Sequence, residues 1–422
     1  MERFLNIIRI PDLRKKILIV MGLLMAFRFL AAIPIPSVDA TRLQELLASN
    51  NLLGLLNIFS GGGLSNLSIA MLGVGPYITA TIVMQLLTVI FPHLKKIYYE
   101  EGTIGRAKFN RLSRFLTVPF AILQSYSFLT LLTSQGVLNP LGASDIIRNV
   151  VVITAGSLVV MWIGELISEQ KVGNGISLLI FGGIVSGIPQ FVARTAASYT
   201  PAMLPTILAF LAVSVAVIAG VVFINQGERK ISVSYARRVR GTKLFGGVAS
   251  YLPLRVNQAG VIPIIFAISI LLFPQFFGQI VSLASVNASI VVNKVVSSFI
   301  GNQLLYGVAY FTLVVVFTYF YTAIMFDPKE ISKNLQQSGG FVPGIRPGEP
   351  TRIFLGYILN RITLFGALFL GVVAILPNIT SAVTGVRTMT IGGTALLIVV
   401  AVAIEIIQQI DSQLAVREYE GI

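Results

Sequence analysis

The stretch ILIVMGLLMAFRFLAAI, residues 17–33, decides the structural class of this protein. All of its residues are apolar except Arg28, so it lacks the alternation of a half-buried strand. At about 1.5 Å of rise per residue, a helix of this length nearly crosses the hydrocarbon core of a bilayer, which is about 30 Å thick. The stretch 390–404 is apolar in the same way. Because a backbone in lipid must satisfy its own hydrogen bonds, we expect the spanning elements to be α-helices.

The composition indicates the same class. Of the 422 residues, 55% are hydrophobic and only 11% are charged, whereas a soluble domain carries about a quarter charged residues. We therefore predict an all-α membrane protein of ten transmembrane helices in two halves, 1–200 and 201–422. The expected spans are approximately 17–36, 71–91, 115–135, 149–168, 176–193, 205–225, 257–277, 303–325, 353–376 and 388–410.

The positive charges predict the topology. Lys and Arg number 31 against 17 Asp and Glu, which gives a net charge of +14. When alternate connections are assigned to opposite sides, one side receives 25 Lys and Arg residues and the other receives five, with Arg28 inside the first span. Because loops rich in Lys and Arg stay in the cytoplasm, both termini and the loops 92–114, 226–256 and 326–352 are predicted to be cytoplasmic.

An internal repeat relates the two halves. The second span of each half begins with the pattern G-V-x-P-x-I, which covers Gly73–Ile78 in the first half and Gly260–Ile265 in the second. Because each half has an odd number of spans, the second half must be inverted relative to the first. Inverted repeats of this kind place a pathway at the interface between the halves.

One apolar segment is too short to span the membrane. Leu52–Ser60 is followed by Gly61, Gly62 and Gly63 and then by residues 64–70. As a helix, its first piece is only about 14 Å long, which is half of a membrane. We predict a re-entrant half-helix that faces protein or a water-filled cavity. The alternative is an amphipathic helix lying on the outer surface.

The reactive residues argue against an enzyme. The chain has no cysteine and one histidine, His93, which leaves no thiolate nucleophile and no multi-histidine metal site. We expect no catalytic residue, no metal and no cofactor. Glu165 and Glu405 lie within about two turns of cytoplasmic helix ends, where pairing between helices is a better explanation than proton transfer. A transporter of small solutes, which would need a polar site at the midplane, is one alternative, and a membrane enzyme is another.

The cytoplasmic loops are longer than topology alone requires. They contain the motifs Gly105-Arg106-x-Lys108, Tyr235-Ala-Arg237-Arg238 and Gly339–Gly348, the last with Arg346 among prolines and glycines. Long basic loops suit an anionic partner such as ribosomal RNA or an acidic motor protein.

Four segments carry a family resemblance. Gly73–Leu87, Trp162–Ile184, Leu252–Pro263 and Asp327–Pro350 resemble the signatures of the bacterial SecY family, the pore subunits of the general protein translocase. The resemblance extends from Ile33 to the last span, and it departs at Asp327, where the family commonly has Asn. It implies a multi-pass protein of a bacterial cytoplasmic membrane that moves unfolded preproteins across and releases transmembrane segments into lipid.

The resemblance also implies roles for individual residues. The segment 52–70 matches the family's plug, and spans two and seven match its lateral gate. The basic loops would dock the motor ATPase SecA or the ribosome, SecE and SecG would be companion subunits, and signal sequences and membrane lipids would meet the gate. A ring of isoleucines suits a channel for arbitrary polypeptides because it excludes water without fixed hydrogen bonds. The matching residues are Ile78, Ile82, Ile180, Ile184, Ile265 and Ile404 (pore ring); Leu55, Ile58, Phe59, Gly61, Gly62 and Gly63 (plug); Pro76, Gln85, Asn257 and Pro263 (gate); and Arg106, Lys108, Arg237, Arg238 and Arg346 (docking).

Overall fold

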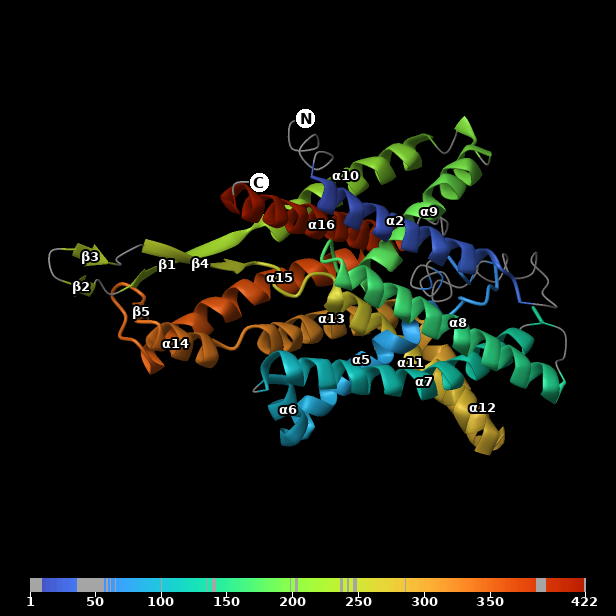
Figure 1. Cartoon of the computed structure of the whole chain (residues 1–422). Helices are drawn as coiled ribbons and strands as arrows, with labels where there is room; N and C mark the ends of the chain where they lie inside the picture. The colour runs from blue at the N-terminus through green and yellow to red at the C-terminus, as the bar shows by residue number, and fades with distance from the viewer. Residues whose placement is uncertain are drawn as a thin grey trace.

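Figure 1 shows the computed structural model of the chain, which is a bundle of helices with a small sheet at one end. The structure describes residues 10–35, 57, 60, 62–64, 66–99, 101–134, 136–138, 142–197, 199–201, 204–235, 238–240, 243–245, 249–284, 286–384 and 392–420.

Each expected span overlaps one long helix. These helices are α2 (Pro11–Ala32), α5 (Gly75–Ile90), α7 (Gly102–Ser134), α8 (Ala143–Glu169), α9 (Gly175–Ala197), α10 (Leu204–Gln226), α11 (Ile262–Ala284), α13 (Gln303–Met325), α15 (Glu349–Thr384) and α16 (Gly392–Glu420). The structure adds α6 (Pro92–Tyr99), α12 (Val286–Gly301) and α14 (Pro328–Gln337), which were not predicted.

Length and apolarity identify a multi-pass membrane protein. Within the described ranges, six helical segments are long and apolar enough to cross a membrane. A seventh is added if α5 and α6, which are bent by 114° at their junction, count as one broken span. The apolar parts of α9 and α11 are shorter, and the first turns of α2 carry charged residues such as Arg14 and Lys16.

The loop after α10 forms a sheet that the sequence analysis missed. Strands β1 (Glu228–Tyr235) and β4 (Ala249–Arg255) pair antiparallel, and β5 (Gly340–Phe341) adds a third strand on the other side of β1. Ile231 and Leu254 of this hairpin pack with Val342 and Leu355 into a small separate core. The pair β2 (Arg238–Arg240) and β3 (Lys243–Phe245) lies farther along the same loop.

Asp327, the residue that departs from the family pattern, caps α14. Its Oδ1 accepts a hydrogen bond of 2.8 Å from the backbone N–H of Lys329. Asp and Asn serve this capping position equally well, so the departure conserves the local structure.

Two seams join the halves of the chain. On one seam α11 packs against α5 and α7, and on the other α16 packs against α9. The start of α2, the end of α16, α14 and the sheet lie toward the same end of the bundle (Figure 1). The loops that the charge count assigned to one side therefore gather at one end of the molecule.

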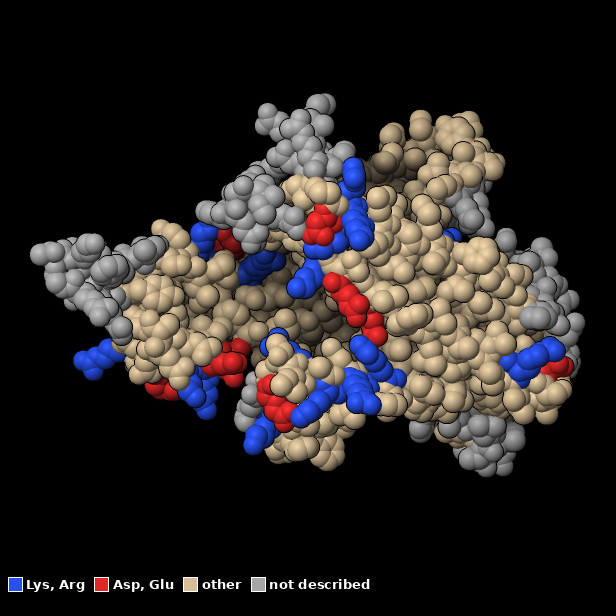
Figure 2. Space-filling model, in the orientation of Figure 1, with Lys and Arg blue, Asp and Glu red and all other residues tan. Residues whose placement is uncertain are grey.

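The charged side chains are distributed unevenly along the bundle. On the face drawn in Figure 2, most Lys and Arg side chains gather toward the end with the sheet and around a hollow in the middle of this face. A broad uncharged surface separates them from a smaller charged group at the opposite end. Such a band is the surface that a bilayer would cover.

Candidate channel between the two halves

The largest buried apolar cluster of the bundle includes aliphatic side chains from helices of both halves. Ile78 and Ile82 come from α5, Ile180 from α9 and Ile265 from α11, and each of these side chains is buried. Ile184, one turn after Ile180, packs at the edge of the same cluster. Five of the six residues expected in the pore ring therefore belong to, or pack against, one large apolar cluster that includes helices of both halves.

The sixth expected residue, Ile404, is placed differently. It is half-buried on α16 and does not pack against this cluster, to which the same helix contributes Ile398 and Val402. α11 also contributes Ile264 and Ile268, which the sequence analysis did not name. Their i, i+4 spacing next to Ile265 was the available signal, because residues one turn apart share a helix face.

The second seam carries a polar contact as well. The side chain of Gln413, near the end of α16, donates a hydrogen bond to the backbone carbonyl of Lys171, which lies between α8 and α9. Lys171 has a φ of +59°, and the next residue, Val172, is buried in the aliphatic cluster. The loop from α8 to α9 is therefore held against the C-terminal half at this end.

The expected gate prolines lie in first helical turns. Pro76 and Pro263 are each the second residue of their helix, α5 and α11, where proline costs no backbone hydrogen bond. They start the helices rather than bend them. Prolines that lie farther inside helices include Pro119 in α7, Pro189 in α9 and Pro274 in α11.

The expected gate amides carry unpaired oxygens. The Nδ2 of Asn257 donates to Oδ1 of Asn225 over 2.7 Å and to the carbonyl of Gly260 over 3.2 Å. Within the part of the chain that the structure describes, Oδ1 of Asn257 and Oε1 of Gln85 are buried without a hydrogen-bond partner. A buried unpaired carbonyl is costly, so these groups favour a state in which they meet water or another chain.

The plug segment is described only in its second part. Leu55, Ile58, Phe59 and Gly61 lie outside the described residues, whereas 62–64 and 66–74 form turns. Among these residues the half-helix that we expected does not continue beyond the glycines. The turns are buried, which argues against the alternative of a surface helix for this part.

Long-range hydrogen bonds explain why this part is not helical. The N–H of Ile35 donates to the carbonyl of Leu67 over 2.8 Å, and the N–H of Ile69 donates to the carbonyl of Ile33 over 3.0 Å. The hydroxyl of Ser157 on α8 donates to the carbonyl of Gly73 over 2.9 Å. The segment is thus attached to the end of α2 and to α8, and its backbone groups are paired outside any helix.

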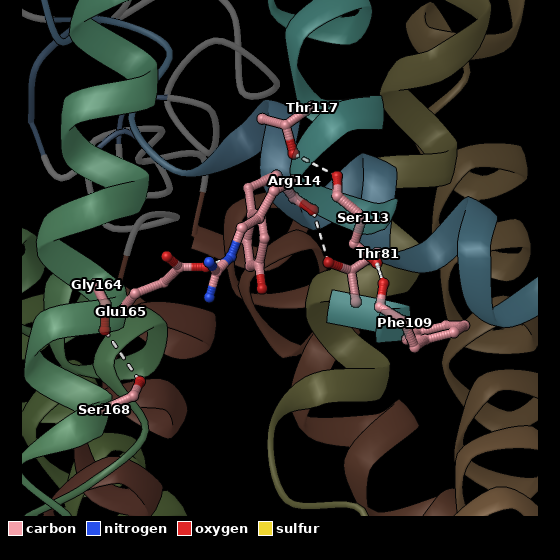
Figure 3. A network of polar contacts seen from close by, with 9 residues as sticks. Thr81, Phe109, Ser113, Arg114, Thr117, Gly164, Glu165 and Ser168 are labelled. Carbon is pink, nitrogen blue, oxygen red and sulfur yellow. Dashed lines mark hydrogen bonds and ion pairs between the residues drawn. The ribbon is translucent and has the colours of Figure 1, made fainter. Parts of the chain in front are cut away.

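A polar network lies between α7 and α8. Arg114 and Glu165 form an ion pair across these helices, and Figure 3 shows their side chains pointing toward one another. This confirms the prediction that Glu165 pairs between helices. The sequence analysis had placed Arg114 in a loop. In the structure it lies within α7, twelve residues after the helix begins at Gly102.

The expected docking residues whose side chains are described lie on α7 and in the turn after β5. Arg106 and Lys108 are exposed on α7, and Lys108 bonds Glu101 over 2.9 Å, which lowers the pKa of that carboxyl. Arg346 is exposed in the turn between β5 and α15. Pairing of β5 with β1 brings this turn onto the hairpin that leads to Arg238. Arg237 lies outside the described residues, and only the backbone of Arg238 is described.

No metal site accompanies this arrangement within the described ranges. Groups of three or more His, Cys, Asp or Glu residues that could hold a metal ion are absent from those ranges. The most prominent feature is therefore an apolar contact between two halves, with basic loops at one end.

Comparison with known proteins agrees with this geometry. The family model described as SecY matches residues 68–407. Protein translocase subunit SecY of Mycobacterium bovis is 40% identical over 451 residues, covering 100% of this chain and 99% of the relative. Protein translocase subunit SecY of Corynebacterium glutamicum is 41% identical and covers 100% of both chains. A solved structure described as "The structure of a protein conducting channel" has the same fold, with a TM-score of 0.64 and 18% identity over 93% of this chain and 90% of its own. The chain belongs to the SecY family.

Proposed function

We propose that the chain is the protein-conducting channel subunit of a bacterial translocase. It moves unfolded preproteins across the cytoplasmic membrane and releases transmembrane segments into lipid through a lateral gate. The observation that carries this proposal is that Ile78, Ile180 and Ile265, from α5, α9 and α11, are buried in one apolar cluster that includes both halves of the chain. The subunit itself is not a catalyst.

The chemistry of the cluster suits a passage for arbitrary polypeptides. Branched aliphatic side chains exclude water by dewetting when they touch, so the closed contact blocks ions. They also separate around a chain without leaving their own polar groups unpaired. Opening along the seam between α11 and α5 would expose the buried amide oxygens of Gln85 and Asn257 to a passing segment.

In this proposal all ten helices span the membrane, in two inverted halves with both termini in the cytoplasm. The long helices α2, α9 and α11 complete the count although they are less apolar or shorter in their apolar parts. The segment 52–70 acts as the plug. The described residues that follow the glycines are attached to α2 and α8 through Leu67, Ile69 and Gly73.

The partners follow from the two kinds of exposed surface. The basic end, with Arg106, Lys108, Arg238 and Arg346, would receive SecA or the ribosome. The outer faces of α2 and α10 expose large apolar side chains, among them Met25, Leu208 and Val215, which fit the lipid or the companion subunits SecE and SecG. Signal sequences would enter at the seam between α11 and α5.

Site-directed crosslinking to a preprotein arrested in transit tests the proposal. The chain contains no cysteine, so Ile78→Cys and the control Val151→Cys each provide a single thiol. Ile78 is buried in the cluster, whereas Val151 is exposed on the outside of α8. We expect a crosslink from position 78 and none from position 151. An arrested preprotein that never crosslinks to position 78 would refute a pathway between the halves, and uptake of small solutes would favour the transporter.

A further inference from the structure

A single arginine interrupts an apolar stripe on the outer face of α15. Ile353, Tyr357, Leu364, Phe365 and Leu368 are exposed on this face, together with Asn360 and Arg361, and they fall at the spacing of one helix face. The opposite face, with Leu355, Leu359, Thr363 and Ala367, is buried. α15 lies in one of the candidate membrane spans, so the exposed stripe is the part of α15 that would face lipid if the helix spans the membrane.

Arg361 lies within this stripe and is exposed. Its guanidinium carbon lies 4.3 Å from the centroid of the Tyr357 ring, one turn toward the start of the helix. In the described part of the chain no carboxylate forms an ion pair with it, whereas Arg352 on the same helix bonds Glu349 over 2.7 Å. The guanidinium therefore keeps its N–H donors available toward the lipid side.

The depth of Arg361 can be measured from its neighbours. A Cβ on Gly356 would lie 4.0 Å from Cγ of Pro328, the first residue of the polar helix α14. Gly356 is therefore level with the point where the chain becomes polar. The Cα of Arg361 lies about 7.5 Å deeper along α15, and its side chain turns back toward Tyr357. The guanidinium thus returns to the level at which lipid headgroups lie.

We propose that Arg361 and Tyr357 bind the phosphate of an anionic phospholipid at the surface of α15. A guanidinium forms bidentate bonds with phosphate oxygens, and the ring of Tyr357 holds it in that orientation. The acyl chains would lie along Leu364, Phe365 and Leu368. The site should prefer a lipid with net negative charge, because a zwitterionic headgroup carries an ammonium that neutralises its own phosphate and repels the guanidinium. This inference requires only that α15 spans the membrane, so it stands or falls independently of translocation.

Quenching by brominated lipids tests the site in the purified channel complex reconstituted into vesicles. Trp162 is the only tryptophan, so Trp162→Phe with Phe365→Trp places one reporter beside Arg361. Brominated phosphatidylglycerol and brominated phosphatidylcholine are compared at equal content. We expect phosphatidylglycerol to be preferred about fivefold at the reporter, which corresponds to about 1 kcal/mol.

The variants make the assignment specific. Arg361→Gln should abolish the preference, Arg361→Lys should retain part of it as a point charge, and the matched control Arg352→Gln should leave it unchanged. Equal quenching by both lipids before any change at Arg361, or a preference that survives Arg361→Gln, would overturn the proposal. A reporter that neither lipid quenches would also overturn it, because a protein partner would then cover this face.

Discussion

Gly73 and Gly260, at equivalent positions of the repeat, adopt the same left-handed backbone conformation, with φ of +52° and +61°. In both copies a buried valine follows, and the helix begins at the next residue with proline second. The N–H of Ile78 donates to the carbonyl of Val74 over 3.0 Å, and that of Ile265 donates to Val261 over 3.3 Å. The sequence repeat is therefore a repeat of structure, and it sets the first turns of α5 and α11, which pack against each other.

The two glycines differ in their surroundings, which predicts unequal effects of alanine. A Cβ on Gly73 would lie 2.7 Å from the Cα of Ser60, whereas a Cβ on Gly260 would meet nothing within 4 Å. Gly260→Ala should therefore lower the free energy of unfolding only by the left-handed strain, roughly 1–2 kcal/mol. Gly73→Ala should lower it further by displacing the plug backbone. Thermal unfolding of the purified variants measures both, and equal losses would contradict the difference in packing.

Polar substitutions at the ring should open the channel to ions. Ile265→Asn places an amide in the buried cluster and should destabilise the closed state by about 1–3 kcal/mol if the amide stays unpaired. We expect raised ion conductance in planar bilayers and export of preproteins with poor signal sequences. Ile404→Asn should act in the same direction but more weakly, because Ile404 is half-buried outside the cluster. A leak as large as that of Ile265→Asn would place Ile404 in the ring after all.

Reversal of charge at Arg346 should reduce transport driven by SecA without impairing folding. Arg346 is exposed in a turn with Pro343, Gly344, Pro347 and Gly348, so Arg346→Glu removes no buried contact of its side chain. We expect severe loss of preprotein protection driven by ATP and SecA at wild-type expression. Lys333→Glu, on the exposed face of α14, is the control for a general loss of positive charge. Normal transport by Arg346→Glu would remove this residue from the docking surface.

The ion pair between α7 and α8 should be measurable by a double-mutant cycle. The side chain of Arg114 is 49% exposed and that of Glu165 is 19% exposed, so solvent screens the pair only in part. Arg114→Gln, Glu165→Gln and the double variant should give a coupling free energy of about 1 kcal/mol in unfolding. Arg114→Gln should be the more costly single change, because it leaves the less exposed charge unpaired. Strict additivity would reduce the contact to a surface pair.

Thiol labelling tests the topology at residues with known exposure. Ile147→Cys and Lys333→Cys introduce single exposed thiols at opposite ends of the bundle. A membrane-impermeant maleimide added to intact cells should label position 147 from outside and should reach position 333 only after lysis. The reverse pattern would contradict the orientation predicted from the loop charges.

The helices could be predicted because a helix that spans a membrane must consist mostly of apolar residues. A span needs a long run of apolar residues, and each of the ten predicted runs overlaps one long helix. One boundary differs clearly from the prediction: α7 begins at Gly102, thirteen residues before the predicted span, and it carries Arg114, which pairs with Glu165 on α8. The ring residues were predicted from positions that match the family motif, whereas the burial of Ile264 and Ile268 depends on which face α11 turns inward.

The rest depends on contacts between distant segments. Residues 66–74 are apolar enough for a helix, yet they form turns because Ile33, Ile35 and Ser157 supply their hydrogen-bond partners. The hairpin did have a local signal, since Ile231 and Val233 alternate with polar residues. The sequence analysis treated this segment only as a basic loop and did not predict a strand there. No local pattern predicts that β5 joins β1.

The β1–β4 hairpin is an extended arm whose base lies close to α11 and α15. Its ladder runs from the pair Glu228 and Arg255 to the pair Ser234 and Ala249, about 20 Å of rigid arm. At its foot the N–H of Val256 donates to the carbonyl of Gly227 over 2.9 Å, and α15 lies so close that a Cβ on Gly366 would meet the carbonyl of Val256 at 2.5 Å. Only residues 257–261 separate the base of the hairpin at Val256 from α11. The hairpin therefore lies five residues from the first turn of α11, and its base packs directly against α15.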